Sequence, residues 1–382
     1  MNNNKNALKW LNSAHFTNDI YTGILSPIMP FIAAKLGITM AFATLAISIS
    51  NVFSSLLQPI FGFFADNILK RVFIFWGLLL TSIFIPIAPL SQSFEALIIF
   101  MILGSLGSSF FHPQASGFVN TFSNEFNDRT YNMGQFISFG SLGYSFGPLI
   151  AAFIIQYLGI TKMPTISIFG IVLAFMMFLF VPKLSTIEKK PEHKSFKETF
   201  KIILSNRKIN YLMVISMMKS LISTSCLVLL PFLWKNMNYT PFYIGVALFL
   251  FIIAGGFASL LSHKIEKITG TKPLLYFSMV ATFPQLVLFA FTYEHHPIIS
   301  MILFVITGFT TMLSQPVTLV MGQEILPEFK SVIAGIMNGF TWGVVAILLS
   351  AIGLFAQKYG ITNILVILAI FPILSTPIIK KL

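Results

Sequence analysis

The chain has 382 residues, of which 56% are hydrophobic, 15% aromatic and only 9% charged, and its mean hydropathy is +0.85. Soluble domains carry about 25% charged residues, so this composition excludes a soluble globular protein and predicts a protein that crosses the bilayer many times. The net charge of +12 does not indicate nucleic-acid binding, because the basic residues lie in loops between apolar segments, where they orient a membrane protein. The single cysteine, Cys226, excludes an intrachain disulfide and a thiolate metal site.

Hydropathy predicts an all-α membrane protein with twelve transmembrane helices. The N-terminus leads directly into the first span without a small-residue cleavage site, so we expect an uncleaved first helix. The expected spans are residues 8–33, 42–64, 72–90, 94–118, 131–157, 162–182, 209–234, 241–262, 273–292, 297–323, 332–356 and 361–379.

One long basic connection divides these spans into two halves. We expect residues 1–182 and 209–382 to form two pseudo-symmetric six-helix bundles, joined by a cytoplasmic basic linker at residues 183–208. Most of the 24 Lys and Arg residues fall on the side of the membrane that holds this linker and both termini. Because basic loops remain in the cytoplasm, the sequence predicts an integral protein of the bacterial inner (cytoplasmic) membrane with both termini cytoplasmic.

The two halves also align weakly with each other. A shift of 201 residues places Pro30 on Pro231, and a shift of 203 residues places Pro113 on Pro316. Six plus six helices with internal similarity are typical of a duplicated transporter whose substrate site lies at the midplane between the halves.

The first span contains a carboxylate, Asp19, close to its middle. A charged side chain at this depth costs about 2.5–3.5 kcal/mol, so Asp19 is expected to have a partner or to face a water-filled cavity. His15 lies one turn earlier on the same helix face, and His112 lies in the cytoplasmic half of the fourth span. Since imidazole titrates near neutrality, we expect Asp19, His15 and His112 to couple transport to protons. A structural carboxylate, a packing histidine and a helix kink beside Pro113 are the respective alternatives.

The loop after the second span contains Gly62, Asp66, Lys70 and Arg71. This spacing resembles the loop signature of the major facilitator superfamily, although a leucine replaces its second glycine. We expect a cytoplasmic gate in which Gly62 allows close helix approach and Asp66 accepts hydrogen bonds or pairs with Arg129. The alternative is a turn whose basic pair only sets topology.

The fifth span contains Gly143, Gly147 and Pro148 within the string GSLGYSFGP. Glycines at this spacing form a groove for close helix packing, and proline bends a helix. The string is similar to the antiporter-associated motif of the same superfamily, and this resemblance favours drug:proton antiport. Small-residue packing without any link to export is the alternative.

Lys219 is a second intramembrane charge, ten residues into the seventh span. At this depth the amine cannot easily reach the interface, so we expect it to bind an anionic substrate or to pair with Asp19. Further candidates for binding substrate are polar residues within spans, each of which could instead form a helix–helix hydrogen bond. They are Asn18, Gln135, Gln315 and Asn338.

Several local strings resemble the fosmidomycin-resistance branch of the superfamily. They are His15–Asp19, Leu57–Pro59, Gly104–Pro113 and Gln323–Pro327. The resemblance extends over nearly the whole chain, is strongest in the first half, and implies an inner-membrane exporter without identifying its substrate.

Together these features predict a secondary active transporter rather than an enzyme. We expect proton-coupled antiport by alternating access, which exports a small anionic or amphipathic compound such as a drug or metabolite. The alternative is a proton-coupled importer of a nutrient or metabolite on the same fold. The partners are expected to be the small molecule, protons and the lipid bilayer, with no nucleic acid, and the protein is expected to be a monomer. No metal and no cofactor are expected, and the sequence lacks a nucleotide-binding loop of the GxxxxGK[ST] type.

Overall fold

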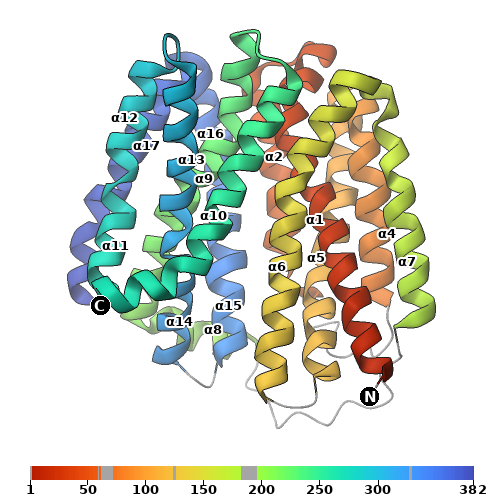
Figure 1. Ribbon diagram of the computed structural model, residues 1–382, viewed down its shortest axis with the longest axis vertical. Helices are drawn as coiled ribbons and strands as arrows, with labels where there is room; N and C mark the ends of the chain where they lie inside the picture. Colours follow the sequence, from red (N-terminus) through yellow and green to blue (C-terminus); the bar gives the residue numbers. More distant parts are fainter. Residues whose placement is uncertain (1, 59, 62–71, 124–125, 182–195, 327–328) are drawn as a thin grey trace. The chain divides into compact units, whose positions relative to one another are not determined.

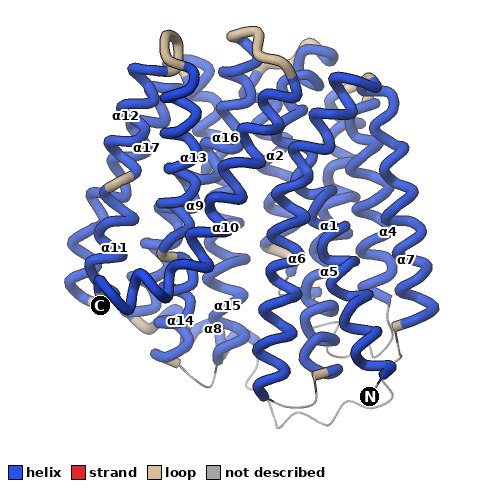
Figure 2. Tube along the Cα trace, viewed as in Figure 1, coloured by secondary structure: helices blue, strands red, loops and turns tan. Residues whose placement is uncertain are grey.

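The computed structural model describes residues 2–58, 60–61, 72–123, 126–181, 196–326 and 329–382. Within these ranges the backbone forms helices and short turns and no strand (Figure 2), which confirms the predicted all-α fold. The predicted gate residues Gly62, Asp66, Lys70 and Arg71 lie outside the described residues. The same is true of residues 183–195, the first part of the basic linker.

Ten helical segments of the described chain are long and apolar enough to cross a membrane. The helices that contain the first two predicted spans are not among them. Helix α1 (Asn2–Leu36) has the length, but polar residues lower its hydropathy, and α2 (Met40–Ser55) has only 16 residues. The ten segments are Val72–Leu90, Phe94–Val119, Asn132–Leu158, Ile160–Phe180, Arg207–Asn236, Pro241–Thr269, Thr271–Thr292, Pro297–Ile325, Thr341–Tyr359 and Ile361–Lys381.

The chain divides into two compact units, each described here by itself. The first comprises Met1–Lys190 and Trp234–Phe249, and the second comprises Pro191–Leu233 and Leu250–Leu382. Besides α1 and α2, the helices of the first unit are α4 (Val72–Ile87), α5 (Phe94–Phe122), α6 (Phe126–Phe153) and α7 (Ser167–Phe180). Within it α1 packs along α6, and α4 packs along both α5 and α7 (Figure 1).

Local sequence signals mark where helices of the first unit begin. The Thr39 hydroxyl accepts a hydrogen bond from the Phe42 N–H at the start of α2, and the Ser93 hydroxyl accepts one from the Ala96 N–H at the start of α5. Such N-caps satisfy amide groups that have no partner within the helix.

Glycines allow α1 and α6 to approach until their backbones touch. A Cβ atom on Gly143 would overlap the Phe16 carbonyl, and one on Gly147 would lie 2.5 Å from the Ile20 carbonyl oxygen and 2.8 Å from the Gly23 Cα. Such close contact requires residues without side chains. Pro148 follows directly within α6.

The second unit combines two continuous helices with several interrupted ones. Helices α9 (Arg207–Asn236) and α10 (Pro241–Thr269) are continuous, and parts of both belong to the first unit. The others are α8 (Phe196–Ser205), α11 (Thr271–Val280), α12 (Thr282–Thr292), α13 (Pro297–Leu313), α14 (Gln315–Ile325), α15 (Lys330–Gly335), α16 (Thr341–Tyr359) and α17 (Ile361–Ser375).

Prolines explain two of these interruptions. Pro284 and Pro316 lack a backbone N–H, and their rings crowd the carbonyl groups four residues earlier. The predicted ninth span accordingly divides into α11 and α12 at Ala281, and the tenth divides into α13 and α14 at Ser314. These breaks interrupt apolar segments that are continuous in the sequence.

Replacing Gly147 with alanine should force α1 and α6 apart, because the added methyl group meets backbone atoms that cannot rotate away. Overpacking of this kind costs about 1–3 kcal/mol, so thermal unfolding of the purified protein in detergent should begin at a lower temperature. Gly134→Ala on the same helix is the matched control, since its methyl group would meet no atom within 4 Å. Equal unfolding temperatures for the two variants would contradict the close approach.

Candidate functional site

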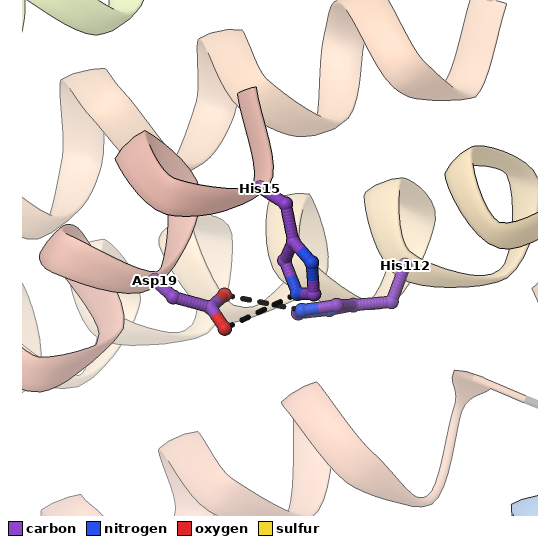
Figure 3. A group of neighbouring side chains, drawn as sticks. All are labelled: His15, Asp19 and His112. Carbon is purple, nitrogen blue, oxygen red and sulfur yellow. Dashed lines mark hydrogen bonds and ion pairs between the residues drawn. The ribbon is translucent and has the colours of Figure 1, made fainter. Parts of the chain in front are cut away.

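Two histidines converge on Asp19 within the first unit (Figure 3). The Nε2 atom of His15 lies 3.2 Å from Oδ2 of Asp19, and the Nε2 atom of His112 lies 3.1 Å from Oδ1. The amide of Asn18 donates a second hydrogen bond to Oδ1, at 3.0 Å. We call His15, Asp19 and His112 the α1–α5 cluster, because α1 supplies the first two residues and α5 the third.

The position of His15 depends on α6. Its Nδ1 atom lies 2.7 Å from the Phe136 carbonyl oxygen, and its ring stacks on the Phe136 ring with centroids 4.0 Å apart. Gly140 provides the space for this imidazole, since a Cβ atom there would overlap it and would lie 2.9 Å from Oδ2 of Asp19. Three elements therefore build the cluster, although only two contribute its titratable side chains.

Contacts within α5 hold His112. Its Nδ1 atom lies 2.9 Å from the Ser108 carbonyl oxygen and 3.2 Å from the Ser108 hydroxyl. Asn18 Nδ2 lies 3.4 Å from the same hydroxyl, which links α1 and α5 a second time. Ser108 thereby orients the His112 ring toward Asp19, beside the His15 ring, whose centroid lies 5.0 Å away (Figure 3).

The cluster is largely enclosed but is not sealed. The side chain of His15 is 9% exposed, that of Asp19 is 16% exposed and that of His112 is 24% exposed. The carboxylate of Asp19 and the imidazole of His112 are therefore the less enclosed members of the cluster.

The donor set also has a composition that metal ions accept. The ligand atoms of His15, Asp19 and His112 lie within 4.8 Å of one another, and two imidazoles with one carboxylate suit a transition metal. We expected no metal here. The separations of 3.1 and 3.2 Å are those of hydrogen bonds between the donors themselves, so we interpret the cluster as a proton site.

The remaining predicted residues are distributed over both units. Asn18 contacts the cluster, and Gln135 precedes Phe136 on α6 and is partly buried. Gln315 begins α14 in the second unit. Asn338 lies in the wide helical turn Ile336–Phe340 and Arg129 in the first turn of α6, and the side chains of both are outside the description.

Lys219 is buried inside the second unit. Only 1% of it is exposed, and its amine donates a hydrogen bond to the Ser314 hydroxyl, whose oxygen lies 2.7 Å from the Ser278 hydroxyl. Ser314 stands at the break between α13 and α14, and Ser278 lies one turn before the break at Ala281. Among the described residues, no carboxylate lies within ion-pairing distance of this amine. Lys219 thus connects α9 to the interrupted regions of two other helices.

Neither the supporting residues of the cluster nor a group of hydroxyls on α9 was identified from the sequence. Ser220, Ser223, Thr224 and Ser225 are buried, and their hydroxyl oxygens have no hydrogen-bond partner within the described structure. Buried hydroxyls in helices usually bond to a carbonyl of the preceding turn, so these oxygens remain available to other groups. In the sequence, the close spacing of hydroxyl residues in the seventh span was the feature that indicates this group. The spacing of the glycines in the fifth span was the feature that indicates Gly140.

Replacing Gly140 with alanine should displace the His15 imidazole and cost about 1–3 kcal/mol of stability through overpacking. In a His15→Ala background the same change should cost less, because the ring that the methyl group meets is gone. A double-mutant cycle on the free energy of unfolding measures this coupling. Gly117→Ala on α5 serves as control, since nothing lies within 4 Å of its methyl group. Additive effects of the His15 and Gly140 substitutions would refute the contact.

Replacing Lys219 with methionine should leave stability unchanged or raise it, because a buried charge without a charged partner is replaced by an apolar side chain of similar volume. Unfolding temperature measures the effect, and the exposed Lys264→Met is the control, expected to change stability by less than about 0.5 kcal/mol. A loss of about 3–5 kcal/mol for Lys219→Met would mean that the amine has a charged partner.

Comparison with known proteins gives consistent matches along almost the entire chain. The sequence matches the Major Facilitator Superfamily over residues 11–351. It is 24% identical over 380 residues to the fosmidomycin resistance protein of Escherichia coli (strain K12), covering 95% of this chain and 89% of that protein. It is 22% identical over 373 residues to the uncharacterised MFS-type transporter YfnC of Bacillus subtilis (strain 168), covering 94% of this chain and 89% of that protein.

Solved structures share the fold at low sequence identity. A bacterial homologue of the human lysosomal transporter Spinster, inward-facing and occupied, superposes with a TM-score of 0.78 at 13% identity, covering 99% of this chain and 96% of that one. The nucleoside transporter NupG also gives a TM-score of 0.78 at 13% identity, covering 98% of both chains. With the family match over residues 11–351, the chain belongs to the major facilitator superfamily.

Proposed function

We propose that this secondary transporter is a proton-coupled antiporter that exports a small anionic or amphipathic compound by alternating access. Membership of the superfamily makes the chain a transporter of small molecules and not an enzyme. The observation that carries the proposal is the α1–α5 cluster, a carboxylate between two imidazoles inside a membrane-crossing unit. Ionisable groups at this depth mark ion and proton pathways.

The cluster is suited to proton exchange for chemical reasons. Imidazole gains and loses protons near neutral pH, and a carboxylate within hydrogen-bonding distance is a partner for the protonated ring. Asp19 and His112 are the more exposed members of the cluster, while His15 is held in place by α6. In this proposal protons enter the cluster while it is open to one side of the membrane, and leave after the transporter has changed its access to the other side.

In this proposal the second unit supports the conformational change between the two access states. Lys219 is too deeply buried to present its amine to an arriving substrate in this conformation, and it connects the interrupted helices through Ser314 and Ser278. We therefore favour a role for Lys219 in the conformational change over the alternative of direct substrate attraction. Asn18, Gln135, Gln315 and Asn338 are proposed to contact the substrate.

The loop residues are assigned to one end-state. Asp66, with Lys70 and Arg71, is proposed to stabilise the closed cytoplasmic face, where Gly62 permits close helix packing and Arg129 offers a cation. Both termini are proposed to be cytoplasmic, in the inner membrane of a bacterium, and the transporter is proposed to act as a monomer.

Two observations favour export over import. The fosmidomycin resistance protein of E. coli is similar over 95% of this chain. The Gly147–Pro148 pair of α6 belongs to the string that resembles the antiporter-associated motif of the superfamily. Fosmidomycin is therefore the first compound to test.

Asp19→Asn should abolish proton-driven export, because an amide cannot replace the charge that the two imidazoles share. In inverted membrane vesicles with an acidified lumen, adding fosmidomycin should collapse the pH gradient for the wild type and leave it intact for the variant. His295→Gln, at an exposed position outside the helices, is the control and should behave as the wild type. Full proton-driven export by Asp19→Asn would overturn the role of this residue. Proton-coupled accumulation in right-side-out vesicles would instead support the importer.

A further inference from the structure

The two histidines of the α1–α5 cluster have the same arrangement of contacts. In each ring the Nδ1 atom faces a backbone carbonyl oxygen, at 2.7 Å from Phe136 for His15 and at 2.9 Å from Ser108 for His112. In each ring the Nε2 atom faces an oxygen of the Asp19 carboxylate. The two residues are 97 positions apart and lie on different helices, so this similarity does not follow from local sequence.

These contacts determine where hydrogen atoms are located. A carbonyl oxygen can only accept a hydrogen bond, so each Nδ1 atom carries a hydrogen. For His112 this hydrogen is directed at the Ser108 carbonyl oxygen at 2.9 Å, the shorter of its two contacts, and the Ser108 hydroxyl oxygen at 3.2 Å is a second acceptor. In a neutral imidazole the other nitrogen then presents a lone pair, and here it would face the lone pairs of a carboxylate. Each Nε2–carboxylate contact is a hydrogen bond only when a proton lies between the two atoms. Two such contacts require two protons.

We propose that the α1–α5 cluster binds and releases two protons per transport cycle, one at the Nε2 atom of each histidine, with Asp19 as their shared counter-charge. This inference rests on the proposed function and extends it from a single titrating carboxylate to a pair of imidazoles. No bond other than these two N–H bonds forms or breaks. Two protons bind to the cluster and add two positive charges, and the same number of protons is later released.

The charge of the cluster inverts between its two end-states. With both protons bound, two imidazolium groups and one carboxylate sum to a single positive charge. Without them the carboxylate remains beside two lone pairs and both contacts become repulsive. Loss of the protons therefore releases His112, the more exposed ring, from α1, whereas His15 remains held by Phe136 and by the space at Gly140.

The surroundings contain few other groups that could take these protons. The described elements that build the cluster are α1, α5 and α6, and from α6 the Tyr144 phenol lies within electrostatic range of Asp19. Asn18 and Ser108 contact the cluster but do not titrate near neutrality. Among the described groups, the two imidazoles are the bases suited to exchange at neutral pH.

Nitrogen-15 spectra of the histidine-labelled protein in liposomes test this proton count without transport. At neutral pH His15 and His112 should both give imidazolium signals, because each contact between an Nε2 atom and the Asp19 carboxylate needs its own proton. The variants His15→Gln and His112→Gln assign the signals, since each removes one of them. Raising the pH of the wild type should remove the two protons in two macroscopic steps that belong to the coupled pair, which provides a measurement that needs no variant.

One imidazolium and one neutral ring, or two neutral rings, would overturn the two-proton cluster. A flux measurement with fosmidomycin in vesicles is the second arm, in which about two protons should move per fosmidomycin for the wild type and about one for each glutamine variant. Two imidazolium signals without any proton-coupled flux would refute the proposed transport and leave the proton count intact. Proton-coupled flux with a single imidazolium signal would refute the two-proton count and leave the proposed transport intact.

Discussion

The packing of the first unit depends on one requirement, which is that the charge of a carboxylate inside a membrane must be compensated by partners. Asp19 cannot remain charged in hydrocarbon without partners, and the structure provides two imidazoles and an amide within about 3 Å of it. Those partners come from two helices, so the requirement for compensation also holds α1 and α5 together. Polar residues that lower the hydropathy of α1 are therefore the residues that connect it to its neighbours.

The glycines of α6 serve the same constraint. Gly143 and Gly147 bring the α6 backbone against α1, and Gly140 leaves the space into which the His15 ring fits. If α6 were farther away, the Phe136 carbonyl could not orient this imidazole toward Asp19. The distance between α1 and α6 therefore determines both how these helices pack and how the His15 imidazole is oriented toward Asp19.

The second unit meets the burial of charge differently. Lys219 has hydroxyl partners in place of a counter-ion, and these hydroxyls stand at or near the points where two helices are interrupted. Within the part of the chain that the structure describes, four further buried hydroxyls, all on α9, lack a hydrogen-bond partner. Incomplete pairing and broken helices are properties suited to the part of a transporter that rearranges.

Composition and hydropathy alone determined that this is an all-α membrane protein, because only helices of about 20 apolar residues satisfy their backbone groups in lipid. The motifs also led to the correct superfamily. The sequence singled out Asp19, His15 and His112 as unusual, since ionisable residues are costly at that depth. It could not show that they touch, because hydropathy carries no information about which face of one helix meets another. The roles of Phe136, Ser108 and Gly140, the burial of Lys219 and the breaks in the second unit were decided by tertiary structure, since they arise from backbone contacts between segments far apart in the chain.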